Sequence, residues 1–188
     1  MAITTLADIV TEVRYITGDV AVVGKDIFTY GNSAVFTLEE SNVSSVDSVF
    51  VNDIEIGESE YSYDSATNKV TITATLSTSD PVEFNYTYFP NYSDTELQGY
   101  IQNAIMQLSI HNYKDFEVID NVIQPAPELK EKNLLAIIAG ILIEPENKSY
   151  RLPDVSISIG GNVLSTFDRI SKTIAIFKKN CTGVYEII

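Results

Sequence analysis

Closely spaced carboxylates are the residues of this sequence that come nearest to a catalytic pattern. Glu39 and Glu40 are adjacent, and Asp53 and Glu55 are separated by one residue. Two carboxylates can act as general acid and base in glycoside hydrolysis when the fold holds them at a suitable separation. Nothing in the sequence sets that separation, and carboxylate pairs are common on acidic surfaces. We therefore expect an acidic surface here and not an active site.

The other residue types that carry chemistry occur singly. His111 is the only histidine, and one histidine cannot supply the ligand set that zinc usually needs. Cys181 is the only cysteine, so neither an intrachain disulfide nor a multi-cysteine metal site can form. Gly160-Gly161 lacks the Lys-Ser/Thr pair of a phosphate-binding loop. The sequence thus predicts a protein that is not an enzyme and has no cofactor or metal site.

Charge and hydropathy restrict the class of partner. The formal charge of −14 disfavours DNA or RNA as a primary ligand, because backbone binding draws its energy from lysine and arginine. Residues 1–113 contain 3 basic and 16 acidic residues, whereas residues 114–188 contain 9 and 10. The N-terminus lacks a signal-peptide pattern, and the longest apolar run, Leu134 to Ile143, is about half a membrane span. We expect a soluble protein that presents unlike surfaces to two partners.

Capping signals and apolar periodicity predict four helices that would position these residues. Thr5–Asp8 is a capping box that begins the first helix, which ends at Gly18, and Ser93–Glu96 begins the second. The third, from Pro127 to Ile143, is apolar on all sides and should be buried at the centre of the core. Ser165–Asp168 begins the fourth helix.

Between the first two helices the periodicity changes to that of strands. Asn52-Asp53 separates two short apolar runs and predicts a tight hairpin. Tyr61–Tyr63 and Val70–Ile72 flank a longer polar turn, and the pattern ends at Pro90. About five to seven short antiparallel strands would form a small sandwich or an open barrel.

The sum is an α+β fold, with one N-terminal and three C-terminal helices around an inserted β module. We expect the helical core at residues 1–18 and 91–180, the β module at 27–90 and a C-terminal tail at 181–188. A short strand, Val155–Ile159, lies alone between two helices. It cannot satisfy its own backbone groups, so it needs a partner strand from elsewhere in the chain or from another subunit.

A series of segments spans most of the chain in order: Thr5 to Tyr15, Val51 to Ile56, Tyr61 to Ile72, Tyr92 to Leu97 and Glu131 to Ile143. Together these segments resemble the head-tail connector, or adaptor, proteins of tailed bacteriophages. The resemblance implies a structural protein of the virion neck, made in the host cytoplasm. Copies would form a ring, typically a dodecamer, below the portal protein. The ring would conduct DNA without binding it specifically and would hold stopper or tail proteins.

Three groups of residues are candidates for these roles. The strand candidates for contact between subunits are Val155, Ile157 and Ile159. The candidates for docking to the portal are Lys178, Lys179, Tyr185, Ile187 and Ile188. The acidic candidates for the channel, where repulsion of phosphates would let DNA slide, are Glu39, Glu40, Asp53, Glu55 and Glu58.

Two alternative functions stay open at the level of sequence. The tyrosines that alternate on predicted strands could form an aromatic platform by which a virion-surface protein recognises carbohydrate or another capsid or tail component; they are Tyr61, Tyr63, Tyr86 and Tyr88. Such tyrosines are also commonly half-buried partners across strands. An enzyme that uses one of the carboxylate pairs is the weaker alternative.

Overall fold

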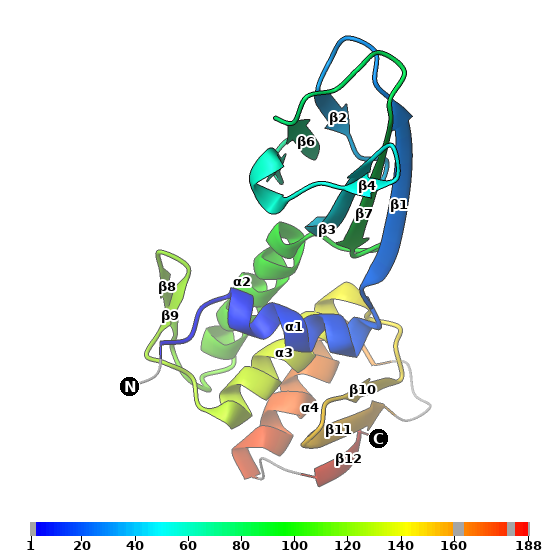
Figure 1. The fold of residues 1–188 in the computed structure, drawn as a ribbon. Helices are drawn as coiled ribbons and strands as arrows, with labels where there is room; N and C mark the ends of the chain where they lie inside the picture. Colours follow the sequence, from blue (N-terminus) through cyan, green and yellow to red (C-terminus); the bar gives the residue numbers. More distant parts are fainter. Residues whose placement is uncertain (1–2, 160–163, 180–182, 188) are drawn as a thin grey trace. The chain divides into compact units, whose positions relative to one another are not determined.

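The computed structural model describes residues 3–159, 164–179 and 183–187 and confirms an α+β fold (Figure 1). The chain divides into two compact units. The helical unit comprises Met1–Asp19 and Asp94–Ile188, and the sandwich unit comprises Val20–Ser93. The sandwich unit is thus a single insertion after the first helix.

Four helices form the core of the helical unit among its described residues: α1 (Ala7–Thr17), α2 (Asp94–Ile110), α3 (Leu129–Ile143) and α4 (Thr166–Lys179). The other three helices all pack against α3. Side chains on every side of α3 are fully buried, as its apolar composition predicts; they are Leu134, Leu135, Ala136, Ile137, Ile138, Ala139 and Ile141.

The predicted ends of the first helix are reproduced, whereas the predicted start of the third is shifted. The Thr5 N–H donates to Asp8 Oδ2 at 2.7 Å, and the Asp8 N–H donates to Thr5 Oγ1 at 3.3 Å. The first helix ends at Gly18, whose positive φ of 68° suits a residue without Cβ. Helix α3 begins at Leu129, two residues after the predicted Pro127, because the Glu128 N–H is capped by Glu131 Oε2 at 2.8 Å.

Gly140 lets α1 approach α3 closely. A Cβ at this position would lie 2.6 Å from Ile16 Cγ2 and 3.4 Å from Tyr150 Cδ1. We expect Gly140→Ala to lower the free energy of unfolding by about 1–3 kcal/mol, because the added methyl overpacks the core.

Gly99 in α2 is the matched control, since a Cβ there meets nothing within 4 Å. Gly99→Ala should raise the free energy by about 0.5–1 kcal/mol. Urea unfolding of both variants tests this, and a shift of the same sign in both would contradict it.

A three-stranded sheet packs beside these helices. It consists of β10 (Ser149–Arg151), β11 (Val155–Ile159) and β12 (Gly183–Ile187), with β11 in the middle. β10 pairs with β11 in antiparallel fashion, and β12 pairs with it in parallel. The partners of the short predicted strand therefore come from the same chain. Residues Gly183–Ile187 form a strand of the helical unit, where the sequence had predicted a separate tail.

A second hairpin in the helical unit was not predicted. Strands β8 (Glu117–Ile119) and β9 (Val122–Gln124) flank Asp120-Asn121. Both turn residues have positive φ, 49° and 64°, as Asn52 and Asp53 have in the predicted hairpin. The same two-residue turn signal is present in both segments.

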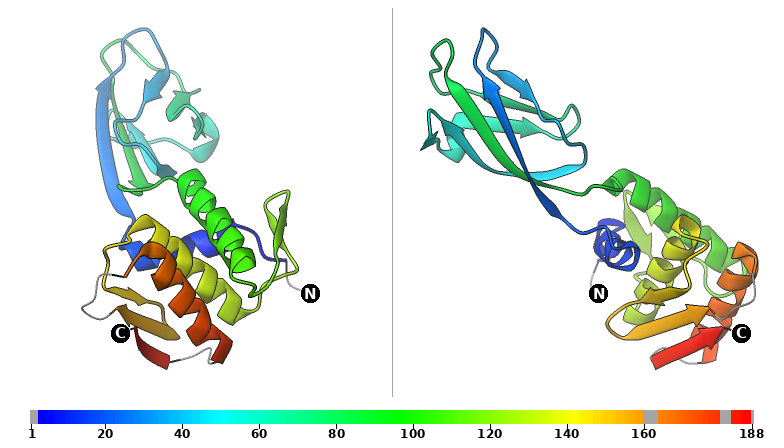
Figure 2. Two further views of the ribbon diagram at one scale, coloured as in Figure 1. Left: turned by 180° about the vertical axis from the view of Figure 1, so that it is seen from behind. Right: turned by 90° about the vertical axis from the view of Figure 1, so that its right-hand side faces the viewer.

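The sandwich unit contains seven antiparallel strands in two sheets (Figure 2). One sheet has the order β1-β7-β3-β4 and the other β2-β6-β5. The strand bounds are β1 Val22–Thr29, β2 Val35–Thr37, β3 Val43–Val51, β4 Ile54–Glu55, β5 Tyr61–Asp64, β6 Lys69–Ile72 and β7 Pro81–Tyr88. The predicted start at residue 27 was five residues too late, because the apolar run at the beginning of β1 hides its alternation.

Aromatic rings join the two sheets of the sandwich unit. Phe36 of β2 lies 5.5 Å from Phe28 of β1 and 5.3 Å from Phe84 of β7, measured between ring centroids. The rest of this core is aliphatic apart from Tyr86; the other buried members are Leu38, Val43, Val49, Val70, Ile72 and Val82. Residues of both sheets thus share one core, as in a β-sandwich.

Candidate interaction surfaces

The predicted acidic candidates are all exposed, but they do not form one cluster. Glu39 and Glu40 lie in the segment that leads into β3, and Asp53 lies in the turn that follows it. A nine-residue strand is about 30 Å long, so these groups mark opposite ends of the sheet. Glu55 and Glu58 lie nearer to Asp53, and both raise the pKa of Tyr61, an effect secondary to that of burial.

The sandwich unit as a whole is strongly acidic. Residues 20–93 contain eleven acidic and two basic residues, a formal charge of −9. One of the two basic residues, Lys25, is bound to Glu83, with 2.8 Å between Nζ and Oε2. The unequal charge that the sequence shows is therefore concentrated in one folded unit.

The strand proposed for contact between subunits is buried in the helical unit. Val155 is 2% exposed and Ile157 is fully buried, while the Ile159 side chain lies outside the described residues. Both edges of β11 are occupied within the chain. Contrary to the prediction, this strand has no edge left to pair with a neighbouring subunit.

The portal candidates fall into two groups. Lys178 and Lys179 are exposed at the end of α4, and Lys178 Nζ donates to the carbonyl oxygens of His111 and Asn112, at 3.4 Å each. This lysine therefore binds the C-terminal end of α2, where cations are favoured. The backbone of Tyr185 and Ile187 belongs to β12, but their side chains and all of Ile188 lie outside the described residues.

Arg14 binds both residues of the helical unit that flank the insertion. It lies on α1 with 7% exposure, and its guanidinium forms ion pairs with Asp19 and Asp94. The Arg14 Nη2 to Asp94 Oδ1 distance is 2.6 Å, and the Asp19 side chain is fully buried. Asp19 is the last residue before the insertion and Asp94 the first after it. One side chain thus holds together the two residues of the helical unit that flank the insertion.

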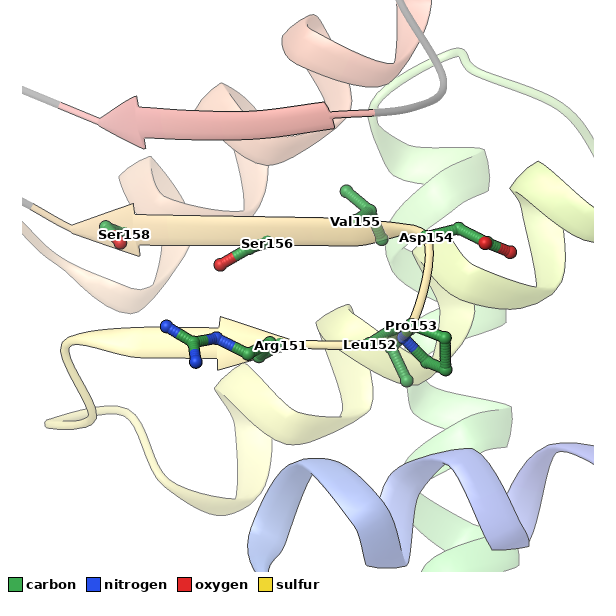
Figure 3. A pocket seen from close by; sticks show the side chains of 7 residues that line it. All are labelled: Arg151, Leu152, Pro153, Asp154, Val155, Ser156 and Ser158. Atoms are coloured by element: carbon green, nitrogen blue, oxygen red, sulfur yellow. The ribbon is translucent and has the colours of Figure 1, made fainter.

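A shallow cavity of about 340 Å³ lies on the β10–β11 hairpin (Figure 3). Arg151 pairs with Ser156 across the two strands, and Ser158 follows on the same face of β11. Pro153 and Asp154 line the cavity at the turn. The lining of the cavity therefore combines one guanidinium, one carboxylate and two hydroxyls with apolar side chains.

An apolar surface on α2 and α4 was missed by sequence reasoning. Met106 and Ile110 lie one turn apart on α2 and are 61% and 58% exposed. The ring of the next residue, His111, packs at a tilt against Phe167 of α4, with 4.8 Å between ring centroids, and Phe167 is 58% exposed. The apolar periodicity of α2 predicts only buried positions. Apolar residues that fall outside this periodicity, such as Met106 and Ile110, are the sequence signal that could have revealed the surface.

The tyrosines of the suggested aromatic platform pack into the sandwich. Tyr86 is 1% exposed, and Tyr61, Tyr63 and Tyr88 are partly buried against the same core. The Tyr63 hydroxyl lies 3.0 Å from Asn68 Oδ1. These rings serve the sandwich core and do not form an open stacking surface.

A buried hydrogen bond joins Tyr86 to Asp26, with 3.0 Å between the hydroxyl and Oδ1. Burial, and then this bond to the carboxylate, raise the pKa of Tyr86 far above its usual range. Its folded-state pKa is therefore higher than its unfolded value, so the stabilisation is complete below about pH 10 and is lost as the pH rises further.

We expect Tyr86→Phe to lower the free energy of unfolding of the sandwich unit by about 1.5–3 kcal/mol at pH 7, because a buried carboxylate loses a donor. Its stability should also fall less steeply above about pH 10. Some slope should persist, since the pKa values of Tyr61 and Tyr63 are also raised by burial. Urea unfolding between pH 7 and about pH 11 measures both effects. An unchanged slope in the variant would show that Tyr86 is not responsible.

Comparisons with known proteins do not place this chain in a family. Neither the models of known protein families nor the characterised proteins contain a match to this chain. Among the described residues, no three histidine, cysteine, aspartate or glutamate side chains come together as a metal site. None of the helices in the described part of the chain combines the length and apolarity that a membrane crossing needs.

Proposed function

We propose that this protein is a head-tail connector of a tailed-phage virion, a structural adaptor that forms a ring below the portal. The ring serves as a DNA conduit and as the attachment platform for stopper or tail proteins. One observation carries the proposal: the chain presents two chemically unlike surfaces, one on each unit. The sandwich unit has a formal charge of −9, and the helical unit exposes apolar side chains on α2 and α4.

A ring requires two different surfaces on every copy, because head-to-tail contacts close only when unlike patches meet. The apolar surface around Met106, Ile110 and Phe167 is suited to such a contact, since exposed apolar groups gather at interaction sites. The acidic sandwich unit is suited to a conduit, where it would repel phosphates and let DNA pass without binding.

The order of elements along the chain also supports an adaptor. The segments that resemble the connector family include most of α1, two hairpins of the sandwich unit, the start of α2 and most of α3. The packing of the tyrosines against the sandwich core favours this proposal over the alternative that the protein recognises carbohydrate. The cavity on the β10–β11 hairpin has the polar groups to bind a protein partner.

Sedimentation with the portal protein encoded in the same genome tests the proposal. We expect the protein to move with the portal at a fixed ratio in a glycerol gradient. Lys179→Glu should weaken this binding about tenfold if α4 contacts the portal. Lys148→Glu, an exposed charge change in the same unit, is the matched control. A protein that stays at the top of the gradient with every portal preparation contradicts the proposal.

A further inference from the structure

The outer edge of β1 is an unoccupied backbone edge in the sandwich unit. β1 lies at one end of the order β1-β7-β3-β4, and its register with β7 runs without a break from Val22 to Thr29. Successive residues of an antiparallel strand direct their N–H and C=O groups to opposite sides. The Tyr30 N–H donates to Asp80 O at 2.8 Å, so the even-numbered residues of β1 face β7.

The odd-numbered residues therefore point their backbone groups outward; they are Val23, Lys25, Ile27 and Thr29. No other strand of the sandwich unit, which is described throughout, pairs with this edge. Four residues thus offer four N–H donors and four C=O acceptors in a regular row.

This edge has few of the features by which proteins usually block edge pairing. Such features are short strands, prolines, bulges and free lysines. β1 has eight residues, no proline and no bulge. Its one lysine is bound across the sheet to Glu83. Val23 and Ile27 are 75% and 64% exposed, so the edge also has an apolar surface.

We propose that the outer edge of β1 binds an extended segment of a partner protein, a segment that alternates apolar and basic residues. The partner adds a strand to the sheet, so that backbone hydrogen bonds provide affinity and side chains provide specificity. Its apolar side chains cover Val23 and Ile27. Its basic side chains complement the charge of −9 of the sandwich unit. The binding does not depend on a location in the virion neck.

A second copy of this chain is a poorer occupant than a basic partner. Pairing of β1 with β1 would bring two units of charge −9 together, and like charges resist close approach. In the register that places Val23 beside Ile27 of the other copy, the two Lys25 residues would lie opposite each other, which destabilises a strand pair.

The test uses the full-length protein and a labelled peptide of about eight residues that alternates valine or isoleucine with lysine. We expect binding by fluorescence anisotropy that weakens as salt rises. In NMR hydrogen exchange, the peptide should protect the amides of Val23, Lys25, Ile27 and Thr29 and leave the even-numbered amides unchanged. A peptide with glutamate in place of lysine should not bind.

Two variants make the test specific for the edge. Ile27→Pro removes one outward N–H and leaves the bonds to β7 intact, so it should weaken peptide binding about tenfold or more. Ile27→Thr removes the apolar contact alone. Ile54→Thr is the matched control, because Ile54 is 70% exposed on β4 at the far edge of the sheet, and it should bind as the wild type does.

Several outcomes would overturn the proposal. One is that the lysine peptide does not bind even at millimolar concentration, and another is that it binds without protecting the four amides. The others are that the glutamate peptide binds as tightly as the lysine peptide, or that Ile54→Thr weakens binding as much as the Ile27 variants do. A wild-type dimer whose β1 amides are already protected would identify a second copy as the occupant and would also refute a basic partner.

Discussion

Replacing Arg14 with methionine should lower the free energy of unfolding of the helical unit by about 3–5 kcal/mol. The guanidinium lies between Asp19, whose side chain is fully buried, and Asp94 at the start of α2. Methionine fills a similar volume but leaves the carboxylate of Asp19 in a buried site without the charge that faces it. The variant should also loosen the two segments of the helical unit that flank the insertion, because Asp19 and Asp94 end them. Urea unfolding measures the loss, and hydrogen exchange assigns it to α1 and the start of α2.

An exposed ion pair of the same unit is the control for Arg14. Lys130 Nζ lies 3.6 Å from Glu128 Oε2, and the two side chains are 41% and 71% exposed. Lys130→Met should change the free energy by less than about 1 kcal/mol. The two carboxylates at Arg14 should also differ: Asp19→Asn should cost more than Asp94→Asn, since the Asp94 side chain is 67% exposed. Equal effects of Arg14→Met and Lys130→Met would refute the role of the buried pair.

Replacing Phe84 with alanine should lower the free energy of unfolding of the sandwich unit by about 3–5 kcal/mol. The ring is fully buried between the sheets and lies 5.7 Å from Phe28 and 5.3 Å from Phe36. Its removal leaves a cavity where three rings meet. Hydrogen exchange should show faster opening of residues 20–93 and unchanged protection of α3, because the units have separate cores.

The exposed Ile54 serves as the control for Phe84. Ile54→Ala removes an apolar side chain of the same unit that is 70% exposed, so the free energy of unfolding should change by no more than about 0.5 kcal/mol. If Phe84→Ala lowered the protection of both units equally, the chain would unfold as one cooperative body, contrary to the expectation.

Local signals were sufficient to predict most of the helices and hairpins. The capping residues at Thr5, Asp8 and Ser165 act within one turn of chain, and the structure has the predicted hydrogen bonds. The turn at Asn52-Asp53 likewise requires only two residues that tolerate positive φ. Such features depend on short-range geometry, so the amino-acid types at a few positions determine them.

The partners of the short strand β11 could not be predicted in the same way. β12 lies more than twenty residues further along the chain and pairs in parallel, across the intervening α4. Parallel pairing leaves no turn signal in the sequence, since its connection is long. The pairing of β11 with β12 depends on tertiary packing against the helices, so it cannot be predicted from the periodicity of the sequence.

The candidate surfaces were predictable in composition but not in place. The acidity of the first part of the chain is visible as a count, but only the fold shows that Glu40 and Asp53 lie at opposite ends of β3. Likewise, Arg14 is an ordinary helical arginine in the sequence. Its role depends on the approach of residues 19 and 94, which are far apart in the chain.

Direct imaging of the protein with the portal protein encoded in the same genome tests the central claim most directly. Class averages from electron microscopy of the mixture should show a closed ring added to one end of the portal, with the portal alone as reference. A portal that stays unchanged beside free monomers, at protein concentrations well above those needed for saturation, would contradict the proposal of a ring-forming connector.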